Sequence, residues 1–198
     1  MRIQIKGILA LSIALTATAI GAPNNGVFKD SRDGKTYKTV KIGKQVWMAE
    51  NLNYKMEGSY CYKNDETYCE NYGRLYEWEA AMKACPEGWH LPTKEEFATL
   101  MSNVGGKKVA GKMLKSTTGW YKDGHGVDMY GFNVLPAGTR IDGSKFRFLG
   151  LGLDALFWGA TEGIMHAHYY LRLKYDYEGA YLDSSMENEA GSVRCVKD

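Results

Sequence analysis

The chain ends in Gly191-Ser192-Val193-Arg194-Cys195-Val196-Lys197-Asp198, which places a cysteine three residues before the C-terminus. The three other cysteines, Cys61, Cys69 and Cys85, lie far upstream. A cysteine this close to the end indicates a covalent link that ties the last strand to the first half of the domain. Such a link requires an oxidising compartment, so the tail predicts location as well as fold.

Four cysteines allow three pairings. Cys61 and Cys69 are eight positions apart, across a polar segment that we expect to form a hairpin or a short loop. This spacing favours Cys61–Cys69, and Cys85 would then pair with Cys195. In the chain-entropy model the short loop contributes about 2.5 kcal/mol and the long loop about 5 kcal/mol. A four-cysteine zinc site is the weaker alternative, because the paired C-x₂₋₄-C spacing is missing.

Residues 1–22 have the organisation of a secretory signal peptide. Arg2 and Lys6 precede an apolar segment over residues 7–20, and small residues follow at Ala17, Ala19 and Ala22. A buried N-terminal helix is less favoured, because a core helix seldom starts at the first residue in this order of polarity. We expect a polar lead-in over residues 23–30, a single domain over residues 31–198, and no membrane-spanning segment. The expected location is extracellular or periplasmic.

The charge balance argues against polyanionic partners. The chain has 25 basic and 23 acidic residues, and removal of Arg2 and Lys6 with the signal leaves 23 of each. A neutral chain without a basic cluster has no concentration of positive charge that would attract nucleic acid or an anionic membrane.

The first part of the domain shows both strand and helix patterns. Alternating residues predict a hairpin over residues 37–48, with its turn at Gly43-Lys44. A helical period predicts a helix over residues 74–85, with Leu75, Trp78, Met82 and Cys85 on its apolar face. The capping box Thr93-Lys94-Glu95-Glu96 starts a second helix, which Gly105-Gly106 ends. Residues 107–114 are expected to form a short third helix.

Short apolar segments separated by turn residues follow residue 116. They predict strands over residues 131–136, 146–148, 155–158, 169–173 and 192–196. A hairpin, two main helices and a loop-rich antiparallel sheet make an α+β domain.

Several segments together resemble the Fibrobacter succinogenes major paralogous domain family. The resemblance covers about residues 27–198, and it rests on residues 30–43, 47–54, 72–76, 85–93 and 192–198. It implies a C-type-lectin-like fold, related to the formylglycine-generating enzyme, in which a helix cysteine pairs with one on the final strand. That supports Cys85–Cys195. The family's biochemical role is not established, so the resemblance supplies no catalytic residues.

The chain departs from related proteins in two respects. It lacks the cysteine at which lipoprotein members of the family are acylated. It also lacks the Glu-Pro-Asn or Gln-Pro-Asp and Trp-Asn-Asp motifs of calcium-dependent lectins, since Leu135-Pro136-Ala137 has no flanking carboxylate.

In a lectin-like fold the long-loop region carries ligand contacts. Aromatic residues mixed with hydrogen-bonding groups suit a carbohydrate or a protein epitope, and packing of these loops onto the core is the equally favoured alternative. The candidate ligand-binding residues are Trp120, Tyr121, Asp123, His125, Tyr130, Arg140 and Asp142.

Metal binding has weaker support. His166 and His168 would face the same side of a strand, with a third ligand from His125, Asp128 or Glu162, but two exposed strand histidines are favoured. An acidic segment containing Asp183, Glu187, Asn188 and Glu189 is favoured as a solvated loop over a cation site. We therefore expect no cofactor and no metal.

The chain has no catalytic motif of the serine hydrolase, zinc protease or phosphate-loop type. The leading hypothesis is a secreted, non-enzymatic binding module whose loops over residues 116–168 contact a polysaccharide or a cell-surface protein. The alternatives are a divergent relative of the formylglycine-generating enzyme, a hydrolase, or a purely structural surface domain.

Overall fold

The structure is a computed structural model that describes residues 24–141, 147–186 and 189–198. The predicted signal peptide (residues 1–22), Asp142, Glu187 and Asn188 lie outside these ranges. Short helices and three antiparallel sheets confirm the α+β class. In the ranges described, no helix has both the length and the apolar character needed to cross a membrane.

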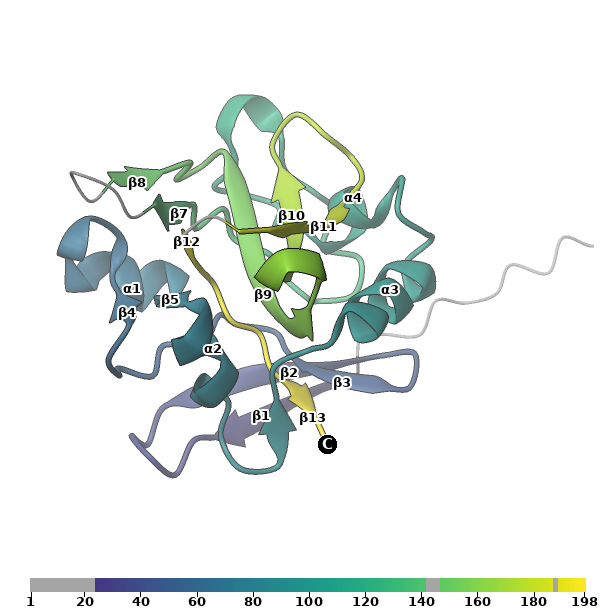
Figure 1. Ribbon diagram of the computed structural model, residues 1–198. Helices are drawn as coiled ribbons and strands as arrows, with labels where there is room; N and C mark the ends of the chain where they lie inside the picture. Colours follow the sequence, from purple (N-terminus) through teal and green to yellow (C-terminus); the bar gives the residue numbers. More distant parts are fainter. Residues whose placement is uncertain (1–23, 142–146, 187–188) are drawn as a thin grey trace, which may run out of the picture.

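The first sheet joins the two ends of the described chain. Its order is β1-β2-β3-β13-β6, and every pairing is antiparallel. The strands are β1 (Asn24–Lys29), β2 (Thr36–Ile42), β3 (Gln45–Met48), β13 (Val196–Lys197) and β6 (Trp89–His90). The hairpin predicted over residues 37–48 is therefore confirmed as β2 and β3. Figure 1 shows the C-terminus beside this sheet, at the bottom of the molecule.

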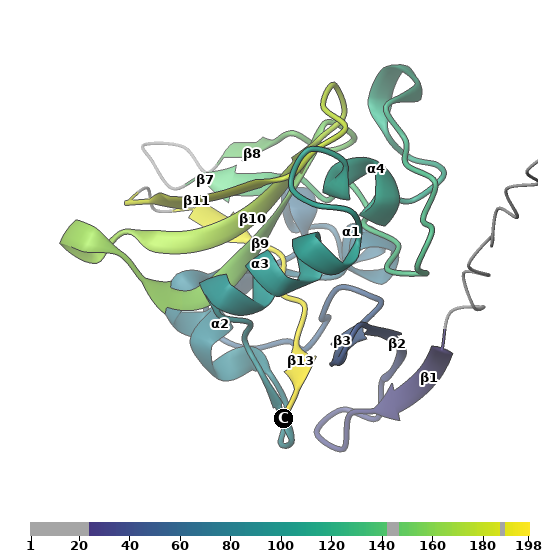
Figure 2. The ribbon, with the colours of Figure 1, turned by 90° about the vertical axis from the view of Figure 1, so that its right-hand side faces the viewer.

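The other two sheets lie above the first in Figure 1. One has the order β11-β10-β9 and the other the order β4-β5-β12-β7-β8. The first contains β9 (Asp154–Glu162), β10 (His168–Lys174) and β11 (Tyr181–Ser185), with η3 (Ile164–His166) between β9 and β10. The second contains β4 (Ser59–Tyr60), β5 (Leu75–Glu77), β12 (Glu189–Gly191), β7 (Thr139–Ile141) and β8 (Arg147–Leu149). In Figure 2 the connection between β9 and β10 projects from the body of the molecule.

The capping box predicts the start of its helix correctly. In α3 (Lys94–Asn103) the Thr93 hydroxyl accepts from the Glu96 N–H, and the Glu96 carboxylate accepts from the Thr93 N–H. The short third helix is present as α4 (Ala110–Leu114), and a 3₁₀ turn, η2 (Tyr121–Asp123), follows it.

The helix predicted over residues 74–85 is only partly correct. Residues Leu75–Glu77 form β5, and the helix α2 covers only Trp78–Ala84. Pairing of β5 with β4 and β12 outweighs the helical period of the local sequence. The shift changes the buried face, so that alanines pack inward and Met82 is 43% exposed.

The segment between Cys61 and Cys69 is helical, and the expected hairpin or short loop was wrong. It contains η1 (Tyr62–Asn64) and the start of α1 (Glu66–Tyr72). The Asp65 carboxylate accepts from the Thr67 N–H, which satisfies a free donor at the helix start.

Two predicted strands are mostly irregular. Residues 131–136 contribute a single bridge, between Val134 and Lys115. The strand predicted over residues 192–196 is present only at its end, where β13 (Val196–Lys197) begins. Before β13 the tail still bonds through its backbone: Leu52 N–H donates to Val193 O and Met48 N–H donates to Cys195 O. Residues 193–195 are therefore bonded to β3 and to the segment after it without forming a regular strand.

Both predicted disulfides are present. We call Cys61–Cys69 the short bridge and Cys85–Cys195 the long bridge. The long bridge joins the end of α2 to the tail, where Cys195 is fully buried. The two pairings use all four cysteines of the chain.

Candidate functional site

The predicted loop residues do not form one exposed surface. Trp120 is 4% exposed and belongs to the main hydrophobic core, where its indole N–H donates to Ser116 Oγ and to Val134 O. Arg140 is also buried, with its guanidinium 3.8 Å from the centre of the Tyr60 ring. The side chains of Trp120 and Arg140 therefore lie in the packed interior of the domain.

The remaining described candidates are more accessible. Tyr121 is 51% exposed, and the exposed Asp123 and His125 lie 3.6 Å apart in an ion-pair geometry. Tyr130 is partly buried against the core. This exposed group contains only three candidates, and no cavity among those described includes them.

The two histidines of the weak metal hypothesis are not neighbours on a strand. His166 lies in η3, and its Nδ1 is 2.5 Å from Glu162 Oε1. His168 begins β10, and its ring stacks on Trp78 with centroids 3.7 Å apart. The expected shared side of a strand was wrong, because the chain turns between the two residues.

Side chains of the types that bind metals converge at a different place in the fold. Within the described ranges, one group of three such side chains converges: Cys61, Glu66 and Cys69. Its two sulfurs form the short bridge, so they are not available as thiolate ligands.

A polar cleft of about 220 Å³ lies at a different place in the fold. It is lined by three segments of the first half, the loop after Phe132, and the tail. We call it the amide cleft, because four asparagines line it. Its lining residues are Lys35, Thr36, Tyr37, Glu50, Asn51, Asn53, Cys69, Glu70, Asn71, Tyr72, Gly73, Asn133, Leu135 and Arg194.

Gly73 makes the floor of the amide cleft possible. Its backbone has φ 76° and ψ −174°, and a Cβ there would lie 2.6 Å from Asn51 Cβ. Without a side chain at this position, α1 approaches the segment after β3 closely. Asn51 Nδ2 then donates to Tyr72 O, and Arg74 N–H donates to Leu52 O.

Arg194 joins three walls of the amide cleft. It is 1% exposed, and its guanidinium donates to Asn51 Oδ1 (2.8 Å), Asn133 O (2.8 Å) and Phe132 O. Burial lowers the pKa of Arg194 to about 9, although Asp128 opposes the shift. Three acceptors and the Phe132 ring, 4.6 Å from the guanidinium carbon, hold this residue in place.

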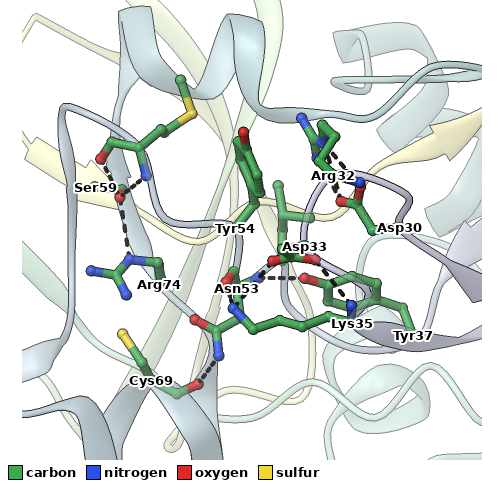
Figure 3. Close-up of polar contacts among 12 residues, drawn as sticks. Asp30, Arg32, Asp33, Lys35, Tyr37, Asn53, Tyr54, Ser59, Cys69 and Arg74 are labelled. Carbon is green, nitrogen blue, oxygen red and sulfur yellow. Dashed lines mark hydrogen bonds and ion pairs between the residues drawn. The ribbon is translucent and has the colours of Figure 1, made fainter.

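Asn53 stands at the centre of the polar contacts in Figure 3. Its Nδ2 donates to Cys69 O, its backbone N–H donates to the Tyr37 hydroxyl, and Lys35 Nζ donates to its carbonyl oxygen. Its Oδ1 is buried and has no hydrogen-bond partner. Asn53 therefore lines the amide cleft, and its unpaired acceptor is buried beneath the surface of the cleft.

Tyr37 supplies a hydroxyl that stays protonated. Burial raises the pKa of Tyr37 to about 12, and the hydrogen bond from the Asn53 N–H opposes that shift. The hydroxyl oxygen is already an acceptor, so its own proton is available for donation.

The sequence contained a signal for the amide cleft, which the hypothesis of ligand binding by the loops over residues 116–168 did not use. Asn51, Asn53, Tyr72, Gly73 and Arg194 all lie in segments that carry the family resemblance. These segments are far apart in the chain, and only the fold shows that they share one cleft.

The fold and the cleft define a class: a disulfide-bonded α+β domain with a polar surface cleft built around its C-terminal tail. The chain belongs to the Fibrobacter succinogenes major domain family, whose sequence model matches residues 40–197. No curated protein and no solved structure matches the chain.

Proposed function

We propose that this protein is an exported, non-enzymatic binding module whose ligand occupies the amide cleft. One observation carries the proposal: four of the five segments that carry the family resemblance contribute to its lining. Folding alone does not require an open polar cleft at their meeting point.

A C-type-lectin-like fold is part of the proposal. The tail strand β13 pairs between β3 and β6, so the beginning and the end of the domain share one sheet. The long bridge ties the end of α2 to the tail, which is the link that the resemblance implies. Export is supported by the two disulfides, which are compatible with an oxidising compartment, together with the predicted signal peptide.

A binding role fits the chemistry of the cleft better than a thiol-dependent reaction. All four cysteines are bonded in disulfides, and a bonded sulfur is not a nucleophile. A hydrolase is the second candidate, because the carboxylates of Glu50 and Glu70 line the same cleft and paired carboxylates carry glycosidase chemistry. Release of reducing ends from bound polysaccharide would favour that candidate.

Co-sedimentation with insoluble polysaccharides and with cell-envelope fractions tests the proposal. Asn71→Ala changes an exposed asparagine of the cleft, and Asn103→Ala changes an exposed asparagine at the end of α3, outside the cleft. We expect the first variant to lose retention and the second to keep it. Equal retention of both variants, or no retention of the unmodified protein by any fraction, would contradict the proposal.

A further inference from the structure

We propose that the ligand of the amide cleft is one uncharged residue at the end of a saccharide chain. This inference rests on the proposed function, and it specifies the class of ligand.

The charges in the cleft favour a neutral ligand. Lys35 and Arg194 balance Glu50 and Glu70 among the lining residues. Both cations are already engaged: Lys35 Nζ lies 3.2 Å from Asp33 Oδ2 and donates to Asn53 O, and Arg194 is enclosed by three acceptors. A phosphate, sulfate or carboxylate ligand would therefore have to compete with these existing partners.

The free hydrogen-bonding groups are both donors and acceptors. Asn71 uses its Nδ2 on Thr67 O and keeps Oδ1, and the Tyr37 hydroxyl keeps its proton. Asn133 is held through its backbone, by Asp128 and by Arg194, which leaves its side-chain amide for a ligand. A sugar hydroxyl both donates and accepts, so neighbouring hydroxyls on one ring complement such amides and hydroxyls.

The volume of the amide cleft limits how much of a saccharide chain can enter it. The amide cleft has a volume of about 220 Å³. It is smaller than the roughly 300–1,000 Å³ typical of sites for drug-sized ligands. One sugar ring with its hydroxyl groups suits this space, and the rest of a saccharide chain would extend into solvent.

Two tyrosines of α1 provide a matched test of this inference. Both tyrosines pack on the same small core with their rings 6.4 Å apart, but only Tyr72 also lines the amide cleft. Replacing either residue by Phe removes a single hydroxyl from a partly buried ring. Loss of one hydrogen bond to a ligand corresponds to about 3- to 10-fold weaker binding.

The probe is a microarray of oligosaccharides with neutral ends of gluco, galacto, manno and xylo configuration, with sialylated and sulfated glycans as anionic comparisons. We expect binding to neutral ends, weakened about 3- to 10-fold by Tyr72→Phe and unchanged by Tyr68→Phe. Neutral-end binding with equal affinity in both variants would overturn the inference.

The inference would also be overturned by binding only to anionic glycans or by no glycan binding. In either case, retention on envelope fractions that depends on Asn71 would leave the proposed function standing with a different ligand, such as a protein. Loss of that retention as well would contradict both proposals.

Discussion

Substitution of Gly73 by Ala should destabilise the domain and distort the amide cleft. The backbone at this position, φ 76° with ψ −174°, is used almost only by glycine and costs other residues about 1–3 kcal/mol. The added Cβ would also lie 2.6 Å from Asn51 Cβ and 2.9 Å from Asn51 O, and overpacking of this kind costs about 1–3 kcal/mol. We therefore expect a loss of about 4 kcal/mol in the free energy of unfolding. For a domain of this size that loss lowers Tm by about 8–16 °C.

Gly88→Ala is the matched control for this prediction. Gly88 has φ 77°, and a Cβ there would meet no atom within 4 Å. Its substitution carries only the backbone penalty of the left-handed region, about 1–2 kcal/mol. Equilibrium urea unfolding, followed by tryptophan fluorescence, measures both variants. If Gly73→Ala is no more destabilising than Gly88→Ala, the close contact with Asn51 does not contribute to the loss.

Three further predictions concern other parts of the domain. Arg194→Met should lower the free energy of unfolding in urea by at least about 3 kcal/mol, because it leaves two buried acceptors and one partly buried acceptor without their donor; a loss below 1 kcal/mol would contradict this role. Cys85→Ser with Cys195→Ser should destabilise by about 5 kcal/mol, and removal of the short bridge by about 2.5 kcal/mol; the reverse order in urea unfolding would show that loop length does not set these values. Burial would lower the pKa of His90, but hydrogen bonds to the carboxylates of Asp198 and Glu96 outweigh it and raise that pKa. The protonated ring therefore stabilises the fold below pH 6.5, and this contribution, less than about 1 kcal/mol at such an exposed site, disappears as the pH rises through the folded-state pKa. His90→Gln should remove this pH dependence from Tm, and an unchanged pH profile would argue against it.

Local sequence signals predicted the parts of the fold whose cause is local. The capping box at Thr93 and the hairpin at Gly43-Lys44 are both present, because each depends on residues within a few positions. The helix over residues 74–85 failed where a distant partner intervened. Gly191 of β12 pairs with Tyr76, and nothing near Tyr76 in the sequence indicates this pairing.

The candidate site was harder to predict for the same reason. Trp120 looked like a ligand-binding aromatic, but its indole N–H has partners in the core that only folding supplies. Asn51 and Arg194 are 143 positions apart and share a hydrogen bond of 2.8 Å. Sequence reasoning found the tail and its disulfide, whereas the cleft beside the tail depends on contacts between distant segments.

A two-dimensional NMR titration that follows the side-chain amide signals of the asparagines tests most directly whether the amide cleft binds the ligand. The probe is the neutral oligosaccharide that binds most strongly on the microarray. We expect the signals of Asn53, Asn71 and Asn133 to shift first and to saturate together, while that of Asn103 stays unchanged. Shifts confined to residues around Tyr121, or no shift of the cleft amides at saturating oligosaccharide, would contradict the claim that the amide cleft is the binding site.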